Sequence, residues 1–258
     1  MFNRSFNLFS KFFFKLLCLV FLGLVWEFIC KTWQFSSLIL PTPIEVFNFL
    51  LQALQSGMIH RHIAQTLFEV ICGLCLGGGV GFCLGVILGE FPKLKFLIMP
   101  YVVASQVVPK LALTPLFILW FGFGTFPVVV MTALICFFPL LENTLTAMEH
   151  VDSLKLQLFR MLGASDYQTL IWLKIPHGAP LILAGVRVAL VLSWVGAVVA
   201  EFMGSSVGLG ALIVAGQGSM NTAMIFASLI LITLMGWIMY AIVLGIERRA
   251  LIHYPRGV

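Results

Sequence analysis

The sequence predicts an all-α protein, a polytopic bundle of about six transmembrane helices. Of its 258 residues, 61% are hydrophobic and only 10% are charged, and the mean hydropathy is +1.08. Soluble domains are about half apolar and a quarter charged, so this chain lacks the polar residues to cover a surface that faces water. Its apolar residues also gather in runs of about 20, the length that an α-helix needs to cross the hydrocarbon core. The composition therefore requires a lipid bilayer as a partner.

Six apolar segments follow one another along the chain, with short connections between most of them. Each is long enough for one span, and the remaining length leaves no room for a large soluble domain. The expected spans are approximately Phe12–Ile29, Ile63–Leu88, Phe96–Phe121, Pro127–Ala147, Pro180–Phe202 and Ala223–Ile246.

The first apolar run could be mistaken for a secretory signal peptide, because Arg4, Lys11 and Lys15 precede it. No small-x-small cleavage site follows the run, which ends at Trp26, so we interpret it as a retained first span. We expect an interfacial segment, this span and an external linker over residues 1–58. A membrane core over residues 59–250 and a tail over residues 251–258 would follow.

Basic residues are distributed unevenly over the connections between the spans. With the N-terminus inside, the outer side receives only Lys31 and Arg61, while Lys110 and Arg187 fall within spans. The inner side receives Arg4, Lys11, Lys15, Lys93, Lys95, Lys155, Arg160, Lys174, Arg248, Arg249 and Arg256. Lysine and arginine favour the cytoplasmic side of short loops. The pattern predicts that both termini and the segment Glu149–His177 lie in the cytoplasm.

The second expected span carries glycines at every fourth position, which places them along one face of a helix. They are Gly73, Gly77, Gly81, Gly85 and Gly89. Membrane helices associate by close packing, and a stripe of small residues lets a neighbouring backbone approach. The stripe predicts a tight helix–helix contact and does not indicate a substrate.

The longest polar connection is the segment Glu149–His177, which breaks into two short helices. Leucines and other apolar residues give the first helix a broad apolar surface, and Gly163 then ends it. Ser165 or Asp166 can cap the second helix, and Pro176 precedes the next span. Apolar residues on a cytoplasmic helix have no lipid to face, so the segment is suited to fill a groove on a partner protein.

Three charged residues lie within or at the ends of the expected spans. Pro109 and Pro115 should interrupt the third span beside Lys110, which makes Lys110 the best candidate for the translocation pathway, together with Pro109. An interfacial helix end that leaves Lys110 among lipid headgroups is the alternative. Arg187 either faces the pathway or extends to the cytoplasmic surface, and Glu201 either lines the pathway or marks the outer end of its helix.

Other classes of site have little support in the sequence. The net charge of +5 comes from basic residues that stand singly between apolar runs, so we expect no nucleic-acid partner. The five histidines lack the spacing of metal ligands, so we expect no metal site. Catalytic residues are not expected either, because neither a G-x-S-x-G elbow nor a zinc motif is present. A phosphate-binding G-x-x-x-x-G-K-[ST] loop is also missing, so we expect this chain to bind no nucleotide.

The segment Glu149–His177 resembles the coupling loop of the permeases of ATP-binding-cassette (ABC) importers, and we call it the coupling segment. The resemblance rests on Gly163-Ala164-Ser165, Gln168 and Ile175-Pro176. At the start of the pattern, where the family has Glu and Ala, this chain has Gln157, Leu158 and Phe159, followed by Arg160.

Similar short motifs run from about residue 40 to 250 and resemble the nitrate, sulfonate and taurine group of these permeases. That group also includes importers of thiamine-precursor pyrimidines and riboflavin. The motifs are Pro41-Thr42-Pro43 with Val46, Thr66 with Gly73, Pro109-Lys110-Leu111-Ala112-Leu113 with Pro115-Leu116, Trp120-Phe121-Gly122, Pro139, Asn143-Thr144, Gly185-Val186-Arg187, Trp194, Ala200-Glu201 and Gly208-Leu209-Gly210.

The resemblance implies a type I ABC importer permease fold, with the permease core over residues 59–250 and the coupling segment over residues 149–177. It implies ABC ATPase subunits that bind ATP and Mg, a second permease copy in a homodimer, and a periplasmic or lipid-anchored solute-binding protein. The expected location is the bacterial plasma (inner) membrane. Sulfonate, taurine, nitrate, thiamine precursor and flavin all remain open as solutes, with a lean toward sulfonates or vitamin precursors.

A secondary transporter or channel without an ATPase partner is the alternative for a hydrophobic bundle. Such a carrier should show inverted repeats with broken helices at matching positions in its two halves. The sequence shows no convincing internal repeat, and a carrier of that class would not need the coupling segment.

Overall fold

The computed structural model describes residues 17, 21–33, 36–252 and 254, and within these residues every regular element is a helix. The chain forms two compact units. One unit comprises Met1–His60 and Leu212–Ile230, and the other comprises Arg61–Ala211 and Leu231–Val258. The expected first span lies partly outside the described residues. The described residues 21–33, which include its end, are helical.

The first unit contains α2 (Pro43–Gln55), which begins at the proline motif that the sequence singled out. Thr42 and Glu45 form a capping box at its start. The Glu45 amide donates to Thr42 Oγ1 at 3.2 Å, and the Thr42 amide donates to Glu45 Oε2 at 2.8 Å. Pro43 occupies the first turn, where its missing N–H costs no helical hydrogen bond. These local signals explain why the external linker turns into a helix here.

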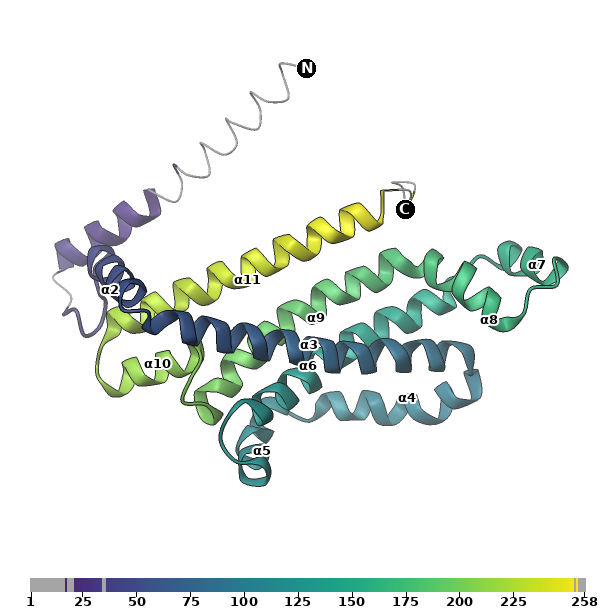
Figure 1. Ribbon diagram of the computed structural model, residues 1–258, viewed down its shortest axis with the longest axis horizontal. Coiled ribbons are helices and arrows are strands. Elements are labelled where there is room, and N and C mark those ends of the chain that lie inside the picture. The colour runs from purple at the N-terminus through teal and green to yellow at the C-terminus, as the bar shows by residue number, and fades with distance from the viewer. Residues whose placement is uncertain (1–16, 18–20, 34–35, 253, 255–258) are drawn as a thin grey trace, which may run out of the picture. The chain divides into compact units, whose positions relative to one another are not determined.

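The second unit is built on three long helices that run beside one another (Figure 1). They are α3 (Met58–Glu90), α6 (Thr125–Glu149) and α9 (Ile175–Gly204). The glycine stripe of α3 lies against α6. A Cβ atom at Gly85 would lie 2.7 Å from Thr144 Cβ, and one at Gly89 would lie 2.5 Å from Met148 Cβ. Any side chain at these positions would therefore force the two backbones apart.

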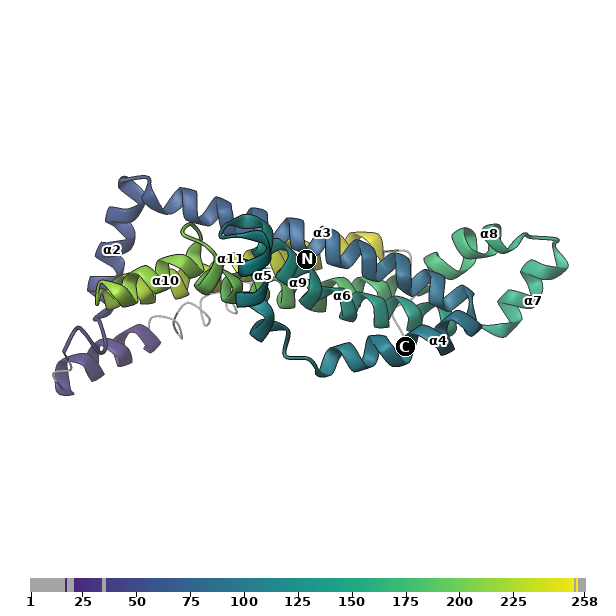
Figure 2. The same cartoon turned by 90° about the horizontal axis from the view of Figure 1, so that it is seen from below.

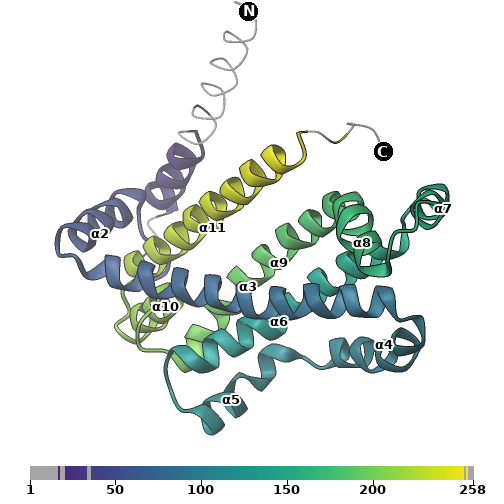
Figure 3. The same ribbon diagram turned by 45° about the vertical axis from the view of Figure 1, so that its right-hand side comes forward.

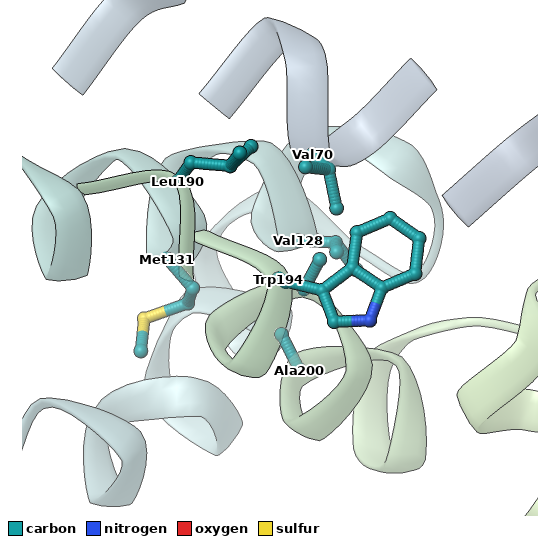
Figure 4. Packing of buried hydrophobic residues seen from close by; sticks show 7 residues of the cluster. Val70, Val128, Met131, Leu190, Trp194 and Ala200 are labelled. Carbon is teal, nitrogen blue, oxygen red and sulfur yellow. The ribbon is translucent and has the colours of Figure 1, made fainter. Parts of the chain in front are cut away.

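The apolar core of this unit gathers around Trp194 of α9 (Figure 4). The surrounding buried residues come from α3, α6 and α9 and are Val70, Val128, Met131, Leu190, Ala197 and Ala200. Trp194 Nε1 donates to the carbonyl oxygen of Ile232 at 3.0 Å, so the ring also ties down α11 (Thr222–Ala250). This bond satisfies the polar atom of a largely buried indole.

The third expected span is not one straight helix. It consists of α4 (Pro92–Val107) followed by η1 (Lys110–Leu113) and α5 (Thr114–Phe121), with a bend of 78° between the two parts. The break comes at Pro109, which has no N–H to continue the helix and restricts the residue before it. Figure 3 shows α5 beside the start of α6, at the end of that helix remote from the coupling segment.

The coupling segment differs from expectation at its second half. After α7 (Ser153–Met161), the chain passes through α8 (Asp166–Thr169) and η2 (Leu170–Lys174) into α9 without interruption, so that residues Asp166–Gly204 form one continuous helix. The second short helix is therefore not separate from the span that follows it, and neither Pro176 nor Pro180 interrupts the helix. The π turn η2 directly precedes Pro176, and its wider winding accommodates a residue that lacks an N–H donor.

Four helices in the described residues are long and apolar enough to cross a membrane, and the bent pair α4 and η1–α5 provides a fifth candidate. The four are Met58–Glu90, Thr125–Glu149, Asp166–Gly204 and Thr222–Ala250. A shorter apolar helix, α10 (Leu209–Gly218), connects the last two. The all-helical, polytopic fold class that the composition predicts is confirmed.

Candidate functional site

The coupling segment extends beyond the ends of α6 and α9, where α7 and α8 form a compact projection (Figure 2). Asp152 begins α7 by accepting a hydrogen bond from the Leu154 amide at 2.9 Å. Val151 and Leu173, at the two ends of the segment, are buried and anchor it to the bundle. Between these two anchors, most residues of α7 and α8 are exposed.

Large apolar side chains on this projection are exposed in the single chain. The exposed set is Leu154, Leu158, Met161, Leu162, Tyr167, Ile171 and Trp172. Met161 has 85% of its surface accessible and Leu162 has 74%, whereas the hydrophobic effect would favour burying both. Several large apolar side chains exposed on one polar connection are typical of a protein–protein interface.

Gly163 makes the turn between α7 and α8 in a left-handed conformation, with φ of +74°. The turn is closed by hydrogen bonds from the Gly163 amide to the Arg160 carbonyl and from the Ala164 amide to the Phe159 carbonyl, each 3.0 Å long. The glycine is needed for its backbone conformation, because a Cβ atom there would meet nothing within 4 Å.

Ser165 and Gln168 form a capping box at the start of α8. The Gln168 amide donates to Ser165 Oγ at 3.2 Å, and the Ser165 amide donates to Gln168 Oε1 at 2.8 Å. Both residues therefore hold the turn together. Two other predicted residues of the segment, Gln157 and Arg160, are exposed on α7.

Four further predicted residues are less accessible or lie farther along the chain. Phe159 and Ala164 are partly buried within the turn that they help to close. Ile175 is partly buried and Pro176 is exposed, and both belong to the first turn of α9. The structure thus places the predicted coupling residues in one continuous projection.

Two ion pairs join the ends of the coupling segment to the connection between α3 and α4. Lys95 Nζ lies 2.5 Å from Glu149 Oε1 at the end of α6, and Lys174 Nζ lies 2.7 Å from Glu90 Oε1. The second pair is well shielded, since its side chains are 17% and 20% exposed. Shielded pairs are screened less by salt than exposed ones. The segment is therefore fixed to the bundle by charge at both ends.

Lys110 is the first residue of η1, in the break between α4 and α5. Its ammonium donates to Gln106 Oε1 one turn earlier. Pro109 is exposed, and Lys110 is partly buried. No carboxylate neutralises Lys110 among the ion pairs of the described residues. An ammonium in this setting can attract an anion.

Arg187 forms an ion pair with Glu247 of α11, with 3.0 Å between Arg187 Nε and Glu247 Oε2. The Glu247 side chain is 12% exposed. The pair neutralises both charges and links α9 to α11 within the second unit. Arg187 is thus engaged by a neighbouring helix, an arrangement that the sequence did not reveal.

Glu201 is completely buried, and the structure brings it together with two residues of the short sequence motifs, Thr66 and Gly210, and with Glu69, which the sequence analysis did not select. Thr66 Oγ1 donates to Glu201 Oε1 at 2.6 Å, and the Gly210 amide donates to Glu201 Oε2 at 2.6 Å. Glu69, one helical turn after Thr66 on α3, is also completely buried. Glu69 could have been selected from the sequence, because it is a glutamate inside an apolar run. Ionisable residues within membrane helices are rare and usually functional.

One family model matches the larger part of this chain. It describes the inner membrane component of binding-protein-dependent transport systems, and it matches residues 81–250. The matched region includes the coupling segment, α9 and all of α11.

Individual relatives and a solved structure agree with this match. A Bacillus subtilis protein, provisionally named as a permease for aliphatic sulfonates transport, is 32% identical over 88% of this chain and 82% of its own length. The riboflavin transport system permease protein RibX of Chloroflexus aurantiacus is 34% identical over 85% of this chain and 82% of its own length. The inward-facing MetNI methionine ABC transporter shares the fold, with a TM-score of 0.60 and 17% identity over 72% of this chain and 91% of that chain. The chain belongs to the binding-protein-dependent transport system inner membrane components and is the permease component of an ABC importer.

Proposed function

We propose that this permease is driven by separate ABC ATPase subunits, which bind it through the coupling segment. The observation that carries the proposal is the exposed apolar surface of α7 and the turn after it. Fully burying one side chain of the size of leucine or methionine contributes about 1.5–3 kcal/mol, so a few such residues suffice for a stable contact. The ion pairs at both ends of the segment would pass a displacement of the ATPase on to α3, α4 and α9.

The complete importer would contain two copies of this chain in the bacterial plasma (inner) membrane. A periplasmic or lipid-anchored solute-binding protein would deliver the solute, and ATP and Mg would be bound by the ATPase subunits. The uneven distribution of basic residues supports a cytoplasmic position for the coupling segment and for both termini.

For the solute we propose a small anion of the sulfonate class or a vitamin or vitamin precursor. The names of the relatives support this choice, because one refers to aliphatic sulfonates and another to riboflavin. Lys110 supports the anionic alternative, since its ammonium lies at the helix break without a carboxylate partner among the ion pairs of the described residues.

Replacement of one exposed methionine tests the ATPase contact. Met161→Asp places a charge on the apolar surface of the coupling segment, where the side chain is 85% exposed in the single chain. The loss of one buried contact and the desolvation of a carboxylate should lower the amount of co-purified ATPase about tenfold or more, since 1.4 kcal/mol is a factor of ten in affinity. The measurement is the ratio of ATPase to permease after affinity purification in mild detergent.

Met220→Asp provides a matched control. Met220 is also exposed, at 72%, but lies in the turn between α10 and α11. Its φ of +53° is one that aspartate adopts more readily than methionine. We expect the ATPase ratio of this variant to equal that of the unchanged protein. Equal ATPase recovery in Met161→Asp and Met220→Asp would refute the coupling role.

A further inference from the structure

A buried polar cluster in the second unit lies away from the coupling segment and plays no part in the function described above. Thr66 and Glu69 come from α3, Glu201 comes from α9, and Gly210 belongs to the first turn of α10. The three side chains have 0% exposure. Buried carboxyl groups in a membrane helix are costly unless each oxygen has a partner.

The hydrogen bonds of the two carboxyl groups can be counted oxygen by oxygen. Glu201 Oε1 accepts from Thr66 Oγ1 and Glu201 Oε2 accepts from the Gly210 amide, both at 2.6 Å. Glu69 Oε1 accepts from Gln65 Nε2 at 2.7 Å. The fourth oxygen, Glu69 Oε2, is buried and receives no donor. It belongs to a carboxyl group one helical turn after Thr66 on α3, and the Thr66 hydroxyl donates to Glu201.

Two ionised carboxylates cannot form a hydrogen bond with each other, because neither has a proton to donate. A proton on Glu69 Oε2 completes the network, since this oxygen then donates to Glu201 and no buried polar atom of the pair lacks a partner. The alternative position for the proton, on Glu201, is less favourable, because both of its oxygens already accept hydrogen bonds.

The start of α10 also favours a negative charge on Glu201. The Leu209 amide donates to Thr66 Oγ1 at 2.8 Å, and the Gly210 amide donates to Glu201 itself. These are free amides of a helix N-terminus, where the helix dipole stabilises a carboxylate. Of the other titratable groups, His62 reaches the same turn, where its Nδ1 lies 3.0 Å from the Gly208 amide that donates to it.

The cluster leaves little space for a hydrated cation as an alternative bridge. A Cβ atom at Gly208 would collide with the carboxyl group of Glu201, and one at Gly210 would lie 2.9 Å from Glu201 Oε2. The two glycines therefore bring the backbone directly onto the carboxylate. The ion pairs of the described residues involve other carboxylates, so no lysine or arginine in that part of the chain neutralises the pair.

We propose that Glu69 and Glu201 share a single proton, held on Glu69, and that this pair fixes the turn before α10 to α3 and α9. Glu69 is a positioning residue, and its role depends on its hydrogen-bond donor and not on a charge. Glu201 carries the negative charge and accepts from α3 and from the start of α10.

The substitutions Glu69→Gln and Glu69→Leu test whether Glu69 acts through a hydrogen-bond donor or through a negative charge. Glutamine keeps the shape, accepts from Gln65 through its oxygen and donates to Glu201 through its NH₂ group. Glu69→Gln should therefore keep the Tm of the full-length protein in detergent. Glu69→Leu removes the donor to Glu201 and the acceptor that Gln65 has at Glu69 Oε1, and it should lower the Tm by about 5 °C.

Glu201→Gln should behave in the opposite way to Glu69→Gln. The amide offers a single oxygen to two donors, Thr66 and the Gly210 amide, so a buried donor loses its acceptor. We expect a fall in Tm similar to that of Glu69→Leu. A protein in which Glu69→Gln is destabilised as much as Glu69→Leu, or in which Glu201→Gln is the tolerated change, would overturn the proposal.

Infrared spectroscopy of the purified full-length chain provides a direct readout of the proton. The unchanged protein should show the C=O stretch of a protonated carboxyl group at neutral pH, and Glu69→Gln should remove one component of this band while the Tm is kept. Glu45→Gln is the control, because this exposed carboxylate already accepts from the Thr42 amide at 2.8 Å and should not contribute to the band. A band that is unchanged by Glu69→Gln would refute the shared proton.

Discussion

At the scale of single residues, the three predicted charged side chains of the spans differ in the partners that the structure gives them. Arg187 and Glu201 are both engaged by neighbours, the first by Glu247 and the second by Thr66 and Gly210. Lys110 differs from them, because its hydrogen bond goes to the neutral Gln106. A cation with a neutral partner retains more of its attraction for an anionic solute than a cation in an ion pair.

Lys110→Met should lower the uptake of an anionic solute while the assembled importer remains intact. At an effective dielectric constant near 20, removing one charge at about 4 Å from the solute costs a few kcal/mol, and uptake at low solute concentration should fall about tenfold or more. Lys110→Arg keeps the charge and should retain most of the uptake. The measurement is uptake of labelled solute into proteoliposomes, and unchanged uptake by Lys110→Met would remove Lys110 from the pathway.

At the scale of elements, the contact between α3 and α6 depends on the absence of side chains. The glycine stripe lets the two backbones approach, and polar residues of α6 such as Thr132 and Thr144 lie directly opposite it. Without a hydrophobic driving force between helices in lipid, such close packing supplies much of the association energy. The α3–α6 contact therefore fixes the frame on which the buried Glu69–Glu201 pair forms.

Two neighbouring glycines of α3 allow a matched test of this contact. A Cβ atom at Gly81 would lie 3.1 Å from the Leu141 amide nitrogen and closer still to the Phe137 carbonyl, whereas one at Gly79 would meet nothing within 4 Å. Gly81→Ala should lower the free energy of unfolding in detergent by about 1–3 kcal/mol through overpacking. Gly79→Ala should leave it unchanged or raise it slightly, because alanine favours a helix more than glycine does. Equal effects at both positions would contradict close packing of the stripe.

At the scale of the whole molecule, the distribution of charge predicts the orientation of the chain in the membrane. Basic residues gather on the connections that we expect on the same side as the coupling segment, which predicts a cytoplasmic position for the proposed ATPase site. The turn between α10 and α11 would then lie on the opposite side of the membrane, where a solute-binding protein would dock.

A reporter fusion tests this orientation. Alkaline phosphatase, which is active only outside the cytoplasm, should be inactive when fused after Val258 and active when inserted after Met220. The positive-inside rule gives the physical reason, because Arg248 and Arg249 lie in the last turn of α11, Arg256 follows in the sequence, and only uncharged residues surround Met220. The reverse pattern of activity would show that the chain is inserted the other way round.

The sequence by itself determined the properties that depend on local composition. Apolar runs of sufficient length predicted the membrane spans, Pro109 predicted the break between α4 and α5, and Gly163 predicted the turn between α7 and α8. Each of these follows from residues that are neighbours in the chain, so a reading of the chain in order was enough. The continuous helix through Pro176 is the exception, because the π turn before it was not visible in the composition.

Only the tertiary structure decided which distant residues meet. Thr66 and Glu201 are 135 positions apart, and Lys174 and Glu90 are 84 positions apart, so no local pattern indicates either contact. The glycine stripe predicted a close helix–helix contact, but it did not predict that the contacting helix is α6. The proposed role of Glu69 as a hydrogen-bond donor to Glu201 depends on the burial of both carboxyl groups, which only the fold brings about. In lipid and in a packed interior a polar atom must find its partner within the protein, and the fold alone determines which partner is in reach.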